Sequence, residues 1–393
     1  MKVLNAAAAL IVLSSLSTGC RASPPVSVKV AILGPLSGNV KSYGEANRDG
    51  ALLAIKEWNA RDGVLGVPIE PTIQDCIFDD MEATAKVTTR LIEEGNIRLI
   101  VGGIAHDAIT ISRIAGAKKA LHISASSADI AVTVDEEGVN KPYSFRAVAL
   151  DSSMVDALAA FAVEELGGRT AAVLYNEEND RETHYAAWFR DGFEARGGAV
   201  PVFEPYDRLA YTQPDTYPWA SLDQVTEAGC DALFLPGYST VANSVARLCR
   251  ERDVRATLLG SDAWHVSPDL DLELLEGSFY WTRYSPDDPR ETVRGFIAAY
   301  EQEHGTDPDE YAALAYDATN ILLDAVAKAG TGDPEHVREV MAELEFEGVT
   351  GKGSFDQLGN PVKDVAIVRI EHGERHFHRR VPPPAGTGTH DAD

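Results

Sequence analysis

Short apolar runs alternate with amphipathic segments along most of the chain. The first run, 28–33, is apolar at nearly every position and rich in β-branched residues, as is typical of a strand covered on both faces. Turn residues in 34–44 end it. From Gly50 the apolar positions recur with helical spacing until Asp62 and Gly63 stop the pattern. This order of strand, loop and helix predicts the opening half of a βαβ unit.

The alternation continues in two similar series, the second of which begins at Asp151. Two long helices are expected within 289–330, and closing strands at 346–355 and 365–370. The pattern predicts an α/β fold with parallel sheets. The other expected strands are 68–74, 98–101, 121–123, 143–146, 170–175, 199–203, 231–235, 256–259 and 278–283, and the expected helices between them include 81–94, 107–120, 154–166, 219–228 and 241–250.

Small and polar residues follow several of the predicted strands. The loop 124–128 is rich in serine, and the opening loop 34–44 is rich in glycine. In open parallel sheets, ligands bind outside the carboxyl ends of the strands, where such loops lie. The alternative is a surface connection without ligand contact.

Composition narrows the class of protein. The chain has 393 residues, which suits two domains, and a formal net charge of -26. Such an acidic chain has no basic stripe with which to neutralise phosphates, which argues against nucleic acid and against electrostatic attachment to an anionic membrane surface. The excess acid does not by itself make the ligand cationic.

The N-terminus has the features of a targeting segment. Met1 and Lys2 are followed by an apolar stretch at 6–13 and by small residues before Cys20. This pattern resembles a bacterial lipoprotein signal over 1–20, in which Cys20 is lipidated, although the position usually occupied by leucine is Ser17. A cleaved secretory signal is the alternative. Residues 21–26 are expected to form a tether and the Pro/Gly-rich 379–393 a disordered tail.

Three cysteines remain after Cys20. Cys230 and Cys249 could form a disulfide in an exported protein, whereas buried free thiols are the alternative, and the odd number leaves at least one, such as Cys76, unpaired. The sequence has no CxxC, HExxH or closely spaced Cys/His cluster, so we expect no metal site and no cofactor.

Several motifs, in order, resemble the type I periplasmic binding proteins, and most closely the branch that binds leucine, isoleucine and valine or small amides. The motifs are GPLSG and YG in 34–44, WNARDGVLG at 58–66, GGIAH at 102–106, ISASSA at 123–128, YSFR at 143–146 with Asp151, LGSD at 259–262 and GKGSFD at 351–356. The resemblance implies two Rossmann-like lobes joined by a hinge of three crossovers. Lobe 1 would comprise 27–146 with about 284–350, and lobe 2 would comprise 147–283 with about 351–378.

The resemblance also implies a ligand site in the cleft between the lobes. In lobe 1, His106 takes the place of a serine that meets the ligand carboxylate, while Ser126 and Ser127 could donate hydroxyl groups. The alternatives are a solvent-exposed His106 beside Asp107 as a helix N-cap, and serines that cap the following segment. Tyr43 could close over the ligand.

In lobe 2, the resemblance assigns the ligand ammonium group to Asp262 and an aromatic contact to Tyr238. The alternative for Asp262 is an N-cap of the next segment. Trp264 could line the cleft or cover the core. Arg181 lies near another aromatic contact of the family, and if it faces the cleft it would favour an acidic or larger polar ligand.

These features predict the extracytoplasmic substrate-binding component of an ABC importer. Its expected partners are a small amino-acid-like or amide-like ligand, an ABC permease and the membrane that holds its lipid anchor, on the periplasmic face. The same fold also serves as a ligand-sensing receptor module, an alternative that the absence of a following transmembrane or output segment disfavours. Enzymatic activity is not expected, because no GxSxG elbow is present and His106 and Asp107 are adjacent on one loop.

Overall fold

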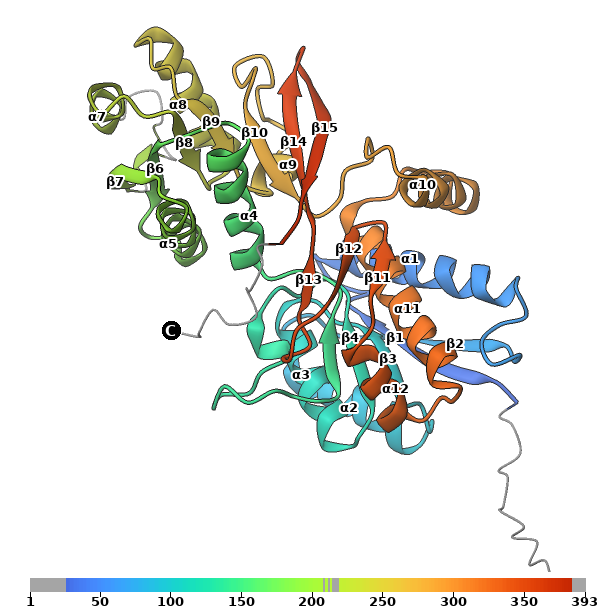
Figure 1. The fold of residues 1–393 in the computed structure, drawn as a ribbon. Coiled ribbons are helices and arrows are strands. Elements are labelled where there is room, and N and C mark those ends of the chain that lie inside the picture. The colour runs from blue at the N-terminus through green and yellow to red at the C-terminus, as the bar shows by residue number, and fades with distance from the viewer. Residues whose placement is uncertain (1–25, 208, 211–212, 214–218, 384–393) are drawn as a thin grey trace, which may run out of the picture.

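The computed structural model describes residues 26–207, 209–210, 213 and 219–383. The expected signal segment with Cys20, the tether up to residue 25 and the end of the expected tail from 384 lie outside the described residues. Two sheets form the centres of two lobes, one built around β1 to β5 and the other around β6 to β10 (Figure 1). This confirms the α/β fold with two lobes. None of the helices in the described part of the chain is long and apolar enough to cross a membrane.

Lobe 1 has a five-stranded parallel sheet in the order β2-β1-β3-β4-β5. Alternate residues of β1 enter two different cores. Val30 and Ile32 pack with α1 and α11, whereas Ala31 and Leu33 pack on the side of α2 and α3. The strands are β1 Val28–Gly34, β2 Ile69–Asp75, β3 Leu99–Gly102, β4 Leu121–Ser124 and β5 Ser144–Arg146. The helices are α1 Lys41–Asn59, α2 Met81–Glu93, α3 Ala105–Ala117, η1 Ile130–Val132 (a short 3₁₀ helix), α10 Glu291–His304, α11 Glu310–Ala329 and α12 Pro334–Ala342.

Lobe 2 has a seven-stranded sheet in the order β15-β14-β10-β9-β8-β6-β7. Strands β6 to β10 pair in parallel, whereas β14 pairs antiparallel with β10 and with β15. The strands are β6 Thr170–Asn176, β7 Ala199–Tyr206, β8 Ala232–Leu235, β9 Thr257–Gly260, β10 Phe279–Thr282, β14 Val365–Glu371 and β15 Glu374–Val381. The helices are α4 Asp151–Glu164, α5 Asp180–Ala195, α7 Ser221–Glu227, α8 Ser239–Glu251 and α9 Ala263–Val266.

The last part of the chain differs from the expected division between the lobes. Strands β11 Phe346–Gly348, β12 Gly351–Phe355 and β13 Pro361–Lys363 form a separate antiparallel sheet. Phe346 and Phe355 bury their rings in the core of lobe 1, so the chain rejoins lobe 2 at Val365 and not near residue 351. The predicted start of the disordered tail at residue 379 is also too early, because β15 continues to Val381 and pairs with β14 up to that residue.

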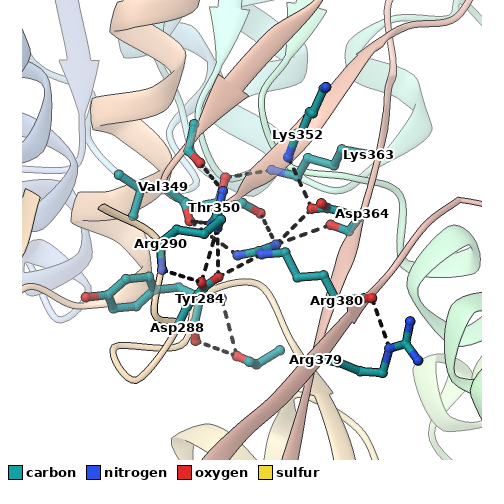
Figure 2. Close-up of polar contacts among 12 residues, drawn as sticks. Tyr284, Asp288, Arg290, Val349, Thr350, Lys352, Lys363, Asp364, Arg379 and Arg380 are labelled. Carbon is teal, nitrogen blue, oxygen red and sulfur yellow. Dashed lines mark hydrogen bonds and ion pairs between the residues drawn. The ribbon is translucent and has the colours of Figure 1, made fainter. Parts of the chain in front are cut away.

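Three crossovers connect the lobes: β5 to α4, β10 to α10, and β13 to β14. Polar side chains join them to one another (Figure 2). On the second crossover, Asp288 accepts hydrogen bonds from Arg290 and from Arg380 of β15, at 2.8 Å for Arg380 Nε. Arg380 also donates to Asp364 on the third crossover. The Lys363 Nζ donates to the Ala147 carbonyl, 2.9 Å away on the first crossover. These five side chains, Asp288, Arg290, Lys363, Asp364 and Arg380, form what we call the hinge network.

All three cysteines in the described part of the chain are free and buried. Cys230 and Cys249 belong to the core between β8, β9 and α8 without forming a disulfide, which confirms the alternative of free thiols.

Candidate ligand-binding cleft

A cleft of about 830 Å³ receives residues from both lobes and from the crossovers. Several of its residues follow the carboxyl ends of parallel strands, as predicted from the loops: Ser126 follows β4, Arg181 follows β6, Tyr238 follows β8 and Asp262 follows β9. The principal lining residues are Tyr43, Ser126, Glu310 and Tyr311 from lobe 1, Arg181, Tyr238, Asp262 and His265 from lobe 2, and Asp151, Arg283 and Tyr284 beside the crossovers.

Four charged side chains on the lobe 2 side of the cleft form a closed ring. Arg181 Nη2 donates to both carboxylate oxygens of Asp262, each at 2.7 Å. Arg283 donates to Asp262 through Nη1 and to Asp151 through Nη2, the latter at 2.6 Å. Arg181 Nε lies 4.0 Å from Asp151, which closes the ring. We call Asp151, Arg181, Asp262 and Arg283 the charged ring. Its two positive and two negative groups balance.

The local structure fixes Arg181 in place. The Asn179 side chain caps α5 by accepting hydrogen bonds from the backbone N–H groups of Arg181 and Glu182. The guanidinium of Arg181 lies 4.9 Å from the ring centroid of Tyr185, and its Nε donates to the Tyr185 hydroxyl. Burial is the largest single effect and by itself would lower the pKa of Arg181, but Asp262, Tyr185 and Asp151 together outweigh burial and raise it. The guanidinium therefore stays charged at neutral pH.

The lobe 1 side of the cleft is aromatic and polar. Tyr43 packs against Tyr311, with ring centroids 4.7 Å apart. Ser126 Oγ accepts a hydrogen bond from Asn47 Nδ2 at 3.2 Å, so its own hydroxyl hydrogen remains available to a ligand. Glu310, the first residue of α11, contributes a carboxyl group. The cleft thus offers hydroxyl, aromatic and charged groups on two surfaces that face each other.

A family model described as periplasmic binding protein matches residues 27–375. The chain belongs to the periplasmic binding protein family.

The chain is similar to several binding proteins. The leucine-, isoleucine-, valine-, threonine- and alanine-binding protein of Pseudomonas aeruginosa is 25% identical over 356 residues, which cover 85% of this chain and 87% of the relative. The crystal structure of the branched-chain amino acid transporter substrate-binding protein LivJ of Streptococcus pneumoniae, in complex with isoleucine, has a TM-score of 0.67 and 23% identity, and covers 91% of this chain and 100% of that chain. A solute-binding protein of Rhodopseudomonas palustris in complex with benzoate has a TM-score of 0.62 and 18% identity, and covers 91% and 97%.

Asp262 does not have the environment that the family resemblance implied. Both of its oxygens already accept hydrogen bonds from Arg181, and Arg283 donates to one of them as well. Asp262 is 5% exposed, so an incoming ammonium group would have to displace a guanidinium to reach it. Asp262 occupies the N-cap position of α9, as the alternative interpretation expected, but its side chain makes no capping hydrogen bond. The sequence placed Asp262 correctly at the cleft but did not reveal its partners.

Two other predicted ligand contacts point away from the cleft. Asp107 is fully buried between α3 and α2, where Thr84 Oγ1 donates to it at 3.4 Å, and burial raises the pKa of Asp107 to about 6. Trp264 is also fully buried, its Nε1 donates to the Gly237 carbonyl, and its ring fills the space in which a Cβ at Gly260 would lie. Of the two alternatives for Trp264, the structure selects the core.

His106 and Ser127 lie beside a smaller recess of about 270 Å³, which shares Ser126 and Tyr311 with the cleft. The His106 side chain is 70% exposed, with Nδ1 3.6 Å from Asp79. Ser127 is buried and donates to the Ala105 carbonyl, and neither it nor Ser126 caps the following 3₁₀ helix, which Asp129 caps. His106 therefore matches the solvent-exposed alternative more closely than a carboxylate-binding role. The expected N-cap at Asp107 is wrong, because α3 already begins at Ala105 and Ile104 holds the N-cap position.

Sequence reasoning missed four residues of the cleft that carry a carboxyl or guanidinium group: Asp151, Arg283, Asp309 and Glu310. Asp151 and Arg283 lie at the ends of predicted crossovers, and this position was the signal that could have revealed them. Glu310 follows Asp309, the N-cap of a strongly apolar helix, and a carboxylate in the first turn of a helix is so common that it carries no signal of its own.

A further cavity of about 610 Å³ lies between α1, α11 and β11. Its acidic residues Glu57 and Asp317 already accept hydrogen bonds, from the Tyr316 hydroxyl and from the backbone N–H groups of Val349 and Thr350 respectively. This cavity lies away from the strand ends and offers no comparable gathering of groups from both lobes.

Proposed function

We propose that the protein is the extracytoplasmic substrate-binding component of an ABC importer and captures a small amino-acid-like or amide-like ligand. The observation that carries the proposal is the cleft itself, in which hydroxyl and aromatic groups of lobe 1 face the charged ring of lobe 2. The named relatives, which bind amino acids or serve transporters, support the same function.

Capture would occur by closure of the lobes over the ligand. A ligand that contacts Ser126 and Tyr311 on one side and Arg181 and Tyr238 on the other makes all its contacts only when the lobes approach each other. It therefore stabilises the closed state relative to the open one. The closed form is then the one presented to the permease.

Arg181 is the group of lobe 2 best suited to an anionic part of the ligand. Its Nη2 and Nε are occupied by Asp262 and Tyr185, but its side chain is 39% exposed at the cleft. A guanidinium held in this way loses little side-chain freedom when it binds a carboxylate. Ser126 offers a second donor on the opposite side.

The proposal includes export and anchoring. Residues 1–20 would direct export, Cys20 would carry the lipid, and 21–26 would tether the lobes to the periplasmic face of the membrane. Replacing Cys20 by alanine should release the protein from the membrane fraction, whereas release of the parent by mild washing would contradict the anchor.

A thermal-shift screen of amino acids, amides and short organic acids tests the function. A ligand that binds only the folded state stabilises it by mass action and so raises the unfolding midpoint. At a ligand concentration of one hundred times the dissociation constant, the free energy of unfolding increases by about 2.7 kcal/mol. Deletion of the protein should abolish uptake of the ligand found in this way. Normal uptake with altered gene expression would contradict the importer and favour the sensing module.

A further inference from the structure

The charged ring is a weak acceptor for a cationic group of a ligand, because its carboxylates are already paired with arginines. Each carboxylate in it already holds at least one guanidinium, and the ring is balanced in charge. Displacing either arginine from Asp262 would leave a buried charge without its partner, which is strongly unfavourable.

Glu310 is the acidic residue of the cleft outside the ring that is buried without a partner. It is 9% exposed, and its Oε2 has no hydrogen-bond partner among the described residues. No ion pair within the described part of the chain includes its carboxyl group, although it lines the cleft. A buried acceptor without a donor is costly, and a ligand that supplies the donor removes that cost.

The surroundings of Glu310 suit a small cation. Tyr311, its neighbour on α11, packs with Tyr43 against the same cleft. Aromatic faces attract ammonium groups, and a carboxylate beside them adds an acceptor of opposite charge. On the lobe 1 side, the Glu310 carboxylate and the two tyrosine rings thus lie at the same cleft.

We propose that Glu310, and not Asp262, receives the cationic group of the ligand, so that the cleft selects amine-bearing ligands from the side of lobe 1. This inference rests on the proposed function and specifies its ligand. It reverses the polarity implied by the family resemblance: the ammonium group contacts α11 of lobe 1, and Arg181 of lobe 2 is free to hold the carboxylate.

Protonation of Glu310 makes the inference testable by pH. Burial raises the pKa of Glu310 to about 7, with Arg283 and Arg181 lowering it and Asp262 and Asp309 raising it. Tyr311, on the same helix, stays neutral because burial raises its pKa as well. Without ligand, the Glu310 carboxyl group is therefore protonated below pH 7 and charged above it. Since only the carboxylate attracts a cation, affinity for an amine should rise from pH 6 to pH 8, and binding should release a proton.

The experiment compares L-amino acids with the matching 2-hydroxy acids, in which a hydroxyl replaces the amine. Calorimetry on the full chain should show amino acids binding the parent at least about tenfold more tightly than their hydroxy analogues. In Glu310→Gln this preference and its rise with pH should disappear. Glu291→Gln is the control, because Glu291 is the first residue of α10 as Glu310 is of α11, but is exposed and outside the cleft.

The outcomes separate a failure of the Glu310 inference from a failure of the proposed function. Equal affinity of the parent and Glu310→Gln for amino acids would overturn the inference while leaving the proposed function intact, as would a parent that prefers the hydroxy acids. If neither series binds the parent but an amide does, the inference fails and the proposed function stands; if no amino acid, amide or organic acid binds, both fail. If Glu310→Gln folds poorly, Glu310→Asp serves in its place. It keeps the charge on a shorter side chain and should retain part of the pH dependence of amine binding.

Discussion

Arg181 Nη2 lies 2.7 Å from both carboxylate oxygens of Asp262, and the two residues are brought together from α5 and from the loop after β9. The pair lies at the cleft, yet each side chain finds its partner of opposite charge in the other, without a ligand. Asp262 thus acts by positioning Arg181, and the ring extends this positioning through Arg283 to Asp151 on the first helix of lobe 2.

Removing the Asp262 side chain should therefore lower the stability of the folded protein more than it changes the choice of ligand. We expect Asp262→Ala to lose about 3 kcal/mol, because it leaves two guanidinium groups in a poorly solvated site. Urea unfolding measures this loss. Asp253→Asn, which removes the charge of an exposed pair with Arg255 but keeps a side chain suited to the left-handed backbone there, should leave the midpoint unchanged. A fully stable Asp262→Ala that loses only amine-bearing ligands would instead support the ammonium role first implied for this residue.

Trp264 should behave as a core residue. Trp264→Ala removes a fully buried ring packed on Gly260 and should cost about 3–5 kcal/mol. Tyr238→Ala, at the exposed N-cap position of α8, should change stability by less than about 0.5 kcal/mol and weaken ligand binding. Thermal unfolding and ligand titration separate the two effects. A stable Trp264→Ala with reduced affinity would indicate that the indole lines the cleft after all.

The buried carboxyl group of Asp107 should make the stability of the protein depend on pH, independently of any ligand. Its pKa in the folded protein is about 6, above the ordinary value of 3.8, because the carboxyl group is buried. The protonated form is thus favoured by folding. The resulting stability is complete below pH 3.8 and is lost as the pH rises through 6. Asp107→Asn should flatten the stability profile in this range and leave ligand affinity unchanged, and denaturant titrations at pH 4, 5, 6 and 7 would reveal it. A weakened affinity in this variant would return Asp107 to the binding site.

The three buried thiols should be inert in the native protein. Burial raises the pKa of Cys76 and of Cys249 to about 12 and also raises that of Cys230, which suppresses the reactive thiolate. In a Cys20→Ser chain, a thiol reagent should label no cysteine at pH 8 and three in denaturant. Labelling of only one in denaturant without reductant would point to a disulfide between Cys230 and Cys249.

The pattern of apolar residues predicted most of the fold because each strand covered on both faces has its own local signature. The run at 28–33 became β1 with its residues divided between two cores. Strands β12 and β13 were assigned to the wrong lobe because Phe355 could bury its ring against either lobe, and only the packing against Phe145 and Phe346 decides.

The site was less predictable, for a physical reason. Strand ends gather loops, so the positions of Arg181, Tyr238 and Asp262 at the cleft followed from topology. Whether a charged side chain is already paired depends on residues far away in the chain. The contact between Arg181 and Asp262 spans 81 positions, and that between Arg283 and Asp151 spans 132. No local pattern could distinguish the paired Asp262 from the unpartnered Glu310.

Each lobe is assembled from distant parts of the chain, which constrains when folding can begin. Val30 and Ile32 of β1 share their core with Leu322 and Phe355, and β14 of lobe 2 is completed only after Val365. Neither core can close while the chain is still being synthesised, because its last strands or helices do not yet exist. A nascent chain of this topology therefore cannot complete either core until it is nearly full length, so both lobes finish folding at almost the same point of synthesis.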